Sequence, residues 1–172
     1  TITVGNVATS ASGLSRLDFA PSNSVIGARI ECHATEDFSE VAKRTADLVF
    51  VTRKDGTHSE KLRITSGGSI GVGVTDPTSY GGAVKLALNS SGHTGLTIAA
   101  GTSSDSNIFF ADGKSGDATY RGNIKYAHNG DSMRFHTAAE EQLRIKSDGK
   151  VGIGTNDPTA HLTVYRQTAF AS

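Results

Sequence analysis

Two stretches of this 172-residue chain repeat one another. Residues 62–78 read LRITSGGSIGVGVTDPT, and residues 143–159 read LRIKSDGKVGIGTNDPT. An internal repeat of this kind means that one structural unit is used twice, which is typical of fibrous and modular proteins. Further matches extend the repeat outward in the same order: 2–4 with 96–98, 17–20 with 108–111, 30–33 with 124–127, 48–52 with 133–137, and 86–88 with 162–164.

The repeat predicts the division of the chain. The two copies account for nearly all of it, so we expect a first module at 1–89, a linker at 90–94 and a second module at 95–172. The first copy carries an insertion relative to the second. The chain begins at Thr1 without a methionine, and we expect it to be part of a longer polypeptide.

The hydrophobic pattern within each copy has a period of two residues. Leu143 and Ile145 alternate with basic residues, while Val151 and Ile153 alternate with glycines. This period is typical of β-strands. The stretch 138–142 is the only one that favours a helix, and it is too short to form one alone. The predicted fold is all-β, with two tandem antiparallel meander modules.

Turn residues predict the strand register in the second copy. If Asn129-Gly130 forms a two-residue type I′ turn, Tyr126 lies opposite Met133 and Ile124 lies opposite Phe135. All four apolar side chains then share one face of the sheet. A slip of one residue would scramble this pattern, so the register is well constrained.

A second loop predicts the next pairing in both copies. A three-residue loop at 147–149, with Gly149 in the left-handed region, pairs 143–145 with 151–153. The equivalent loop at 66–68 pairs 62–64 with 70–72. Glycines then alternate with the apolar residues and lie on the opposite face. Glycine inside a strand usually marks the close approach of another backbone, and we expect that neighbour to be another chain. These glycines are Gly71, Gly73, Gly152 and Gly154.

The pattern LxIxSDGxVGIGTxDPTxxLxV at 143–164 resembles a module common in the tail fibres of tailed bacteriophages. It is especially similar to fibres that end in a self-cleaving intramolecular chaperone. The first copy departs from the pattern at Gly67 and Val74 and adds residues 79–82 after the proline. No part of the chain resembles the helical chaperone, so self-cleavage is not carried over to any residue here.

The resemblance implies an intertwined or closely packed homotrimer on the virion tail, outside the cell. Its implied function is that of a structural segment involved in host attachment. The implied partners are other fibre segments and a host surface glycan or outer-membrane receptor. Two alternatives remain open: a capsule-degrading tailspike enzyme, and a bacterial surface adhesin or injection-system fibre.

Composition argues against several other classes of protein. Lysine plus arginine equals aspartate plus glutamate at 17 each, so charge predicts no nucleic-acid binding. No apolar run reaches the roughly 20 residues of a membrane span, and we expect no membrane insertion. Cys32 is the only cysteine, which rules out an internal disulfide. It aligns with Tyr126, so we expect a buried, unreactive thiol.

The sequence predicts no enzyme, cofactor or metal site. The Gly-x-Gly pairs lack a third glycine and a following helix, because an Asp-Pro pair comes next. The six histidines include no metal-binding pair, although a trimer axis would bring three copies of one histidine together. A glycan-cleaving site would need two carboxylates across a groove, and the acidic clusters lie at 36–40 and 140–141.

The connection at 35–45 is the largest difference between the two copies, because it replaces the tight turn at Asn129-Gly130. Variable loops on a rigid scaffold often carry recognition. A charged rim around one aromatic side chain is typical of a small binding epitope, although a solvated hairpin loop fits almost as well. The predicted receptor contacts are Glu36, Asp37, Phe38, Glu40, Lys43 and Arg44.

Overall fold

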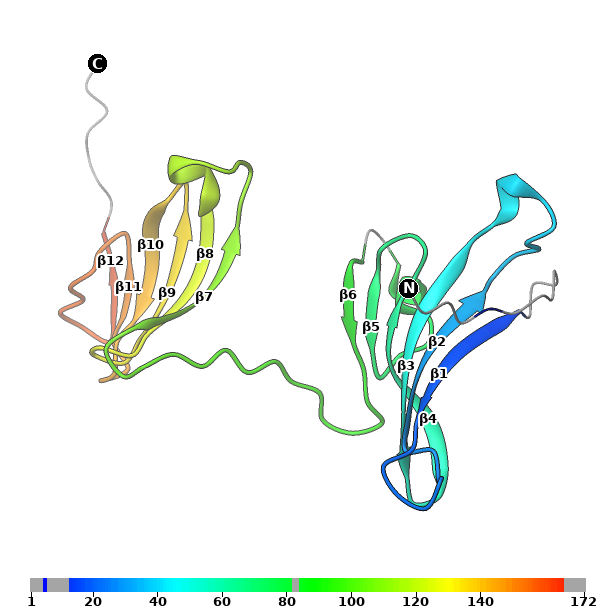
Figure 1. The fold of residues 1–172 in the computed structure, drawn as a ribbon. Helices are drawn as coiled ribbons and strands as arrows, with labels where there is room; N and C mark the ends of the chain where they lie inside the picture. Colours follow the sequence, from blue (N-terminus) through cyan, green and yellow to red (C-terminus); the bar gives the residue numbers. More distant parts are fainter. Residues whose placement is uncertain (1–4, 6–12, 82–83, 166–172) are drawn as a thin grey trace. The chain divides into compact units, whose positions relative to one another are not determined.

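The computed structural model describes residue 5, residues 13–81 and residues 84–165. The chain divides into two compact units, Thr1–Gly95 and Leu96–Ser172, and each unit contains one six-stranded sheet (Figure 1). The all-β prediction is confirmed, since the only helical elements in the described part are 3₁₀ turns of three or four residues. The expected match at 2–4 lies outside the described residues.

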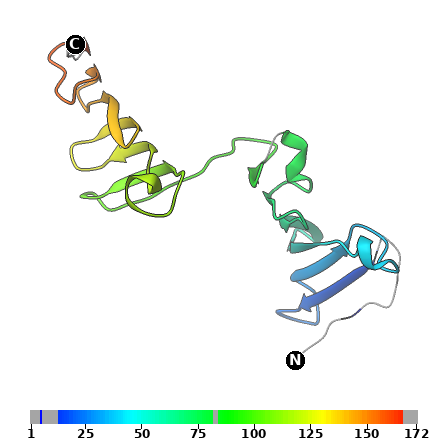
Figure 2. The same cartoon turned by 90° about the horizontal axis from the view of Figure 1, so that it is seen from above.

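The two sheets have the same strand order, β1-β2-β3-β4-β5-β6 in the first module and β7-β8-β9-β10-β11-β12 in the second. Figures 1 and 2 show each sheet as a single layer of strands. The first module consists of β1 Leu14–Phe19, β2 Ala28–Ala34, η1 Val41–Lys43, β3 Ala46–Lys54, β4 Thr57–Ile64, β5 Ile70–Val72, η2 Pro77–Tyr80 and β6 Leu86–Leu88. The second consists of β7 Asp105–Phe110, η3 Gly116–Thr119, β8 Gly122–Ala127, β9 Ser132–Thr137, β10 Glu140–Ile145, β11 Val151–Ile153 and β12 Leu162–Val164.

The register predicted for β8 and β9 is confirmed, with Tyr126 opposite Met133 and Ile124 opposite Phe135. The predicted type I′ turn at Asn129-Gly130 is wrong. Positive φ occurs at Gly130 and Asp131, at 89° and 44°, and not at Asn129. The Tyr126 hydroxyl donates to the Asp131 carboxylate at 3.1 Å, which helps to hold this aspartate in a left-handed conformation that few residues tolerate.

Both three-residue loops are confirmed. The Lys146 amide donates to the Lys150 carbonyl at 2.9 Å, and Gly149 has a φ of 80°. In the first module the Thr65 amide donates to the carbonyl of residue 69 at 2.9 Å, and Gly68 has a φ of 76°. The strand pairs 143–145 with 151–153 and 62–64 with 70–72 follow as predicted.

The meander prediction is wrong for the last strand of each module. β6 pairs with β5 in parallel, and β12 pairs with β11 in parallel. The cause lies in the connection after each Gly-x-Gly pair. Instead of a hairpin, a loop with an Asp-Pro turn carries the chain back to the start of the preceding strand. Each module is therefore a five-strand antiparallel meander closed by one parallel strand.

The close neighbours of the glycines belong to the same chain, which corrects the expectation of another chain. A Cβ placed on Gly71 would lie 2.5 Å from the Val74 carbonyl oxygen, and one on Gly152 would meet the Thr155 carbonyl. A Cβ on Gly154 would lie 2.6 Å from the Tyr165 carbonyl oxygen. The loop before the last strand thus packs against Gly71 and Gly152, and the residue after the last strand packs against Gly73 and Gly154.

A matching β-bulge occurs in both modules. The pairing shifts at Lys61 in β4 and at Gln142 in β10. The Gly73 amide donates to the Lys61 carbonyl at 3.0 Å, and the Gly154 amide donates to the Gln142 carbonyl at 2.9 Å. The glycine amides thereby occupy the carbonyls that the bulge leaves outside the ladder.

The two faces of each sheet differ in burial. We call the face that carries Ile30, Phe50, Ile124 and Phe135 the apolar face, and the opposite one the polar face. Buried polar residues lie on the polar face, such as Glu31, Asp47, Asn123 and Ser132, at 4–8% exposure. The apolar face stays largely open. Cys32 lies on that face and is exposed, so the expected buried thiol is wrong.

Candidate functional site

The predicted recognition loop connects β2 to β3 and includes η1. Most of its charged residues bind the loop itself. The Asp37 carboxylate accepts the Ser39 amide at 2.9 Å, and this hydrogen bond lowers the pKa of Asp37. The Lys43 ammonium lies 3.1 Å from the Glu40 carboxylate. The loop is consequently braced by short-range contacts rather than by the sheet.

The remaining predicted contacts close the loop at its base. Arg44 donates to the Phe38 carbonyl at 3.1 Å, and the Thr45 hydroxyl donates to the Glu36 carboxylate. The Phe38 side chain is only half-exposed. The apolar side chain that projects is Val41, at 78% exposure, and it is not among the contacts predicted from the sequence. The 35–45 connection is therefore a charged loop with the aliphatic side chain of Val41 at its tip.

An arginine on the polar face of each module binds two or three acidic oxygens. Arg63 donates to both Glu60 oxygens at 2.9 and 2.6 Å and to Asp47 at 2.7 Å. The hydrogen bond to Glu60 raises the pKa of Arg63. In the second module, Arg144 binds both Glu141 oxygens at 2.7 Å. The bulge makes this possible, because it places residues three apart on one face.

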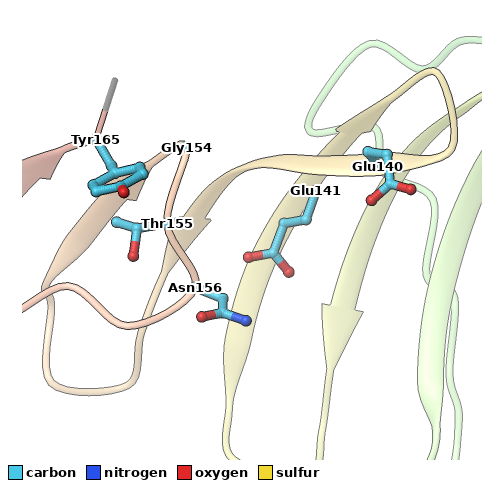
Figure 3. A pocket seen from close by; sticks show the side chains of 6 residues that line it. All are labelled: Glu140, Glu141, Gly154, Thr155, Asn156 and Tyr165. Carbon is cyan, nitrogen blue, oxygen red and sulfur yellow. The ribbon is translucent and has the colours of Figure 1, made fainter. Parts of the chain in front are cut away.

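Beside this pair, a polar hollow of about 390 Å³ opens on the second module. Figure 3 shows the Glu141 and Asn156 side chains pointing toward one another, with Tyr165 and Thr155 on the β12 side. Glu140 and Gly154 complete the lining. Since Arg144 occupies both Glu141 oxygens, Glu141 suits polar binding better than proton transfer.

The apolar face is a further candidate interface of each module. Its central and edge strands expose side chains that a soluble protein normally covers. In the first module these include Leu17, Phe19, Leu48, Ile70, Val72 and Leu86, at 36–56% exposure. In the second they include Ile108, Phe110, Phe135, Ile145, Ile153, Leu162 and Val164, at 39–64% exposure. Both modules present the same face in the same way.

In the described part of the chain, histidine, cysteine and acidic residues form no group of three able to hold a metal ion. Within the same residues, no helix has the length and apolar character needed to cross a membrane. Comparison with protein-family models and with curated proteins finds no match.

Proposed function

We propose that this chain is a structural segment of a bacteriophage tail fibre, located outside the cell on the virion tail and involved in host attachment. Three copies assemble with their apolar faces inward and their polar faces outward. The observation that carries this proposal is the open apolar face, which is repeated in both modules. The repeated motif at 143–164, with its resemblance to tail-fibre modules, supports it.

The magnitude of the hydrophobic effect favours assembly. Fully burying a leucine, isoleucine, valine or phenylalanine side chain contributes roughly 1.5–3 kcal/mol. Because the residues concerned are about half-exposed, each stands to contribute about 1 kcal/mol when a partner covers it. Among the described residues, few aliphatic side chains are fully or nearly buried: Val49, Val51, Ala87 and Ala127. The isolated sheet therefore lacks a core of ordinary size, and neighbouring copies supply it.

The polar face suits contact with solvent. Its charged residues are already paired, as in Arg63 with Glu60 and Asp47 and in Arg144 with Glu141. Burying such pairs in a second interface would cost desolvation energy without a compensating partner. Outward polar faces also leave the 35–45 loop accessible to the host surface, whether glycan or outer-membrane protein.

The test is the molar mass in solution, measured by light scattering at micromolar concentration. We expect three chains per particle; two chains would instead indicate two sheets packed face to face. Val164→Lys, at 64% exposure on the apolar face, should shift the particle toward monomer. Val41→Lys is the matched control, because Val41 is exposed but lies in the loop. A parent chain that remains monomeric would refute the assembly.

Host attachment is tested separately, on cells. Shortening the 35–45 connection to Asn-Gly should preserve the circular dichroism spectrum, because the second module joins the equivalent strands with a short loop. Cell binding should fall if this loop contacts the receptor. Full binding by the shortened fibre would assign recognition to another segment. Release of oligosaccharide from capsule would favour the tailspike alternative.

A further inference from the structure

The second module has a hollow on its polar face. It measures about 310 Å³, near the lower end of small-molecule sites. One cross-strand row runs through it, from Phe109 on β7 to Asn123 on β8 and His136 on β9. Its other lining residues are Asp105, Asn107, Tyr120, Lys125 and Ala139.

Two buried polar atoms in this row have no hydrogen-bond partner. Asn123 is only 7% exposed, and its amide nitrogen donates to the Asn107 side chain at 3.1 Å, while its Oδ1 is unpaired. His136 Nδ1 is likewise buried and unpaired. A buried polar group without a hydrogen-bond partner destabilises the fold. Such a cost at two adjacent residues points to a ligand that pairs with them.

Two aromatic side chains flank these polar atoms. Phe109 is 55% exposed and Tyr120 is 39% exposed. The Tyr120 hydroxyl donates to Asp117 at 2.8 Å, which holds the ring in place. Lys125 and Asp105 neutralise one another at 2.9 Å, so the hollow carries no uncompensated charge from this pair. Open aromatic faces beside neutral hydrogen-bonding groups match a ligand that is both flat-faced and hydroxylated.

The repeat provides an internal comparison. At the positions of Phe109, Asn123 and His136, the first module has Asp18, Arg29 and Val51. Arg29 Nε lies 3.2 Å from Asp18 Oδ1 without forming a hydrogen bond, and Val51 is buried. The first module thus fills this place with an ion pair and an aliphatic side chain. The same scaffold therefore accepts a charged pair in this row, whereas the second module places a side-chain amide and an imidazole there.

We propose that the hollow along the row Phe109–Asn123–His136 binds one ring of a neutral saccharide. Sugar hydroxyls donate to Asn123 Oδ1 and pair with His136 Nδ1, and the C–H face of the ring packs on Phe109 or Tyr120. The inference deepens the proposed role in host attachment and rests on it for its biological meaning. It also places a saccharide contact outside the 35–45 loop.

The test uses the full chain labelled with ¹⁵N and four free sugars, each titrated in turn: D-glucose, D-galactose, D-mannose and N-acetyl-D-glucosamine. We expect at least one to shift the amide signals of β7, β8 and β9 saturably, with a dissociation constant on the order of 1 mM. No saturable shift with any of the four, or shifts confined to other residues, would overturn the proposal; ordered water then satisfies the two atoms.

Variants separate binding from folding. Phe109→Ala removes an exposed ring, and His136→Val installs the residue that the first module uses, so both should keep the native spectrum. Each should weaken sugar binding at least tenfold. Tyr80→Ala is the matched control, because Tyr80 is also 55% exposed but lies outside the hollow. Unchanged affinity in both variants would refute the site.

The outcomes of this test and of the molar-mass test are independent. A trimer that binds none of the four sugars would contradict the saccharide site alone. A monomer that binds a sugar in this hollow would contradict the fibre assembly alone.

Discussion

Three glycines of the second module allow the cost of backbone conformation to be separated from the cost of close approach. Gly149 has a φ of 80° and open space around its missing Cβ. Gly152 does not have a positive φ, but a Cβ at this position would contact the Thr155 carbonyl and the Pro158 ring. Gly154 combines a φ of 69° with the Tyr165 carbonyl oxygen 2.6 Å from a Cβ. Alanine at each position therefore tests one factor or both.

The expected losses follow from these two factors. A left-handed alanine costs roughly 1–2 kcal/mol, which is the loss expected for Gly149→Ala. Forcing extra volume into a packed site costs typically 1–3 kcal/mol, which applies to Gly152→Ala. Gly154→Ala should lose both, about 2–5 kcal/mol, because the Tyr165 carbonyl must move while the Tyr165 amide holds the Ile153 carbonyl at 2.8 Å.

The measurement is urea unfolding followed by circular dichroism, with amide signals from each module resolved by NMR. The order of stability loss should be Gly154 first, with smaller losses at the other two. The loss at Gly152 should not depend on protein concentration, because its neighbours belong to the same chain. If Gly152→Ala lowered the stability only of the assembled protein, the result would indicate that another chain contacts Gly152. Alanine at 154 that costs no more than alanine at 149 would refute the close-approach reasoning.

Three further predictions concern the hairpins and ion pairs. Ala138 and Ala139 both have positive φ, at 53° and 66°, so replacing Ala138-Ala139 by Asn-Gly should raise stability by roughly 1–2 kcal/mol in urea unfolding. Arg63→Met should cost about 3 kcal/mol, more than Arg144→Met. It removes the guanidinium shared by Glu60 and Asp47, whereas Glu141 still has Arg134 at 3.8 Å after Arg144 is replaced. Equal losses in the same assay would contradict this. The hydrogen bond from Lys125 lowers the pKa of Asp105 below 3.8. The Lys125–Asp105 pair stabilises the fold at pH values above the ordinary pKa of aspartate. This stabilisation is lost as the pH falls through the lowered pKa of Asp105. NMR titration of the Asp105 carboxyl carbon measures that pKa, and Lys125→Met should return it toward 3.8.

The candidate sites show the limit of sequence reasoning most clearly. The 35–45 loop was found from the sequence because it is a contiguous difference between two copies. The hollow was not found, because Phe109, Asn123 and His136 come from three strands. A residue-by-residue alignment of the two copies indicates the hollow, because the side-chain type differs at all three positions. The first module has Asp18, Arg29 and Val51 where the second has Phe109, Asn123 and His136.

The sequence by itself determined the two modules, the loops at 66–68 and 147–149, and the register of β8 with β9, β10 with β11 and β4 with β5. These features depend on local properties, namely a period of two residues and the conformational preferences of turn residues. Only the tertiary structure decided that β6 and β12 run parallel to their neighbours, and which chain approaches Gly71 and Gly152. A glycine in a strand shows that something passes close to it, whereas the identity of that neighbour depends on the path of the following loop across the sheet.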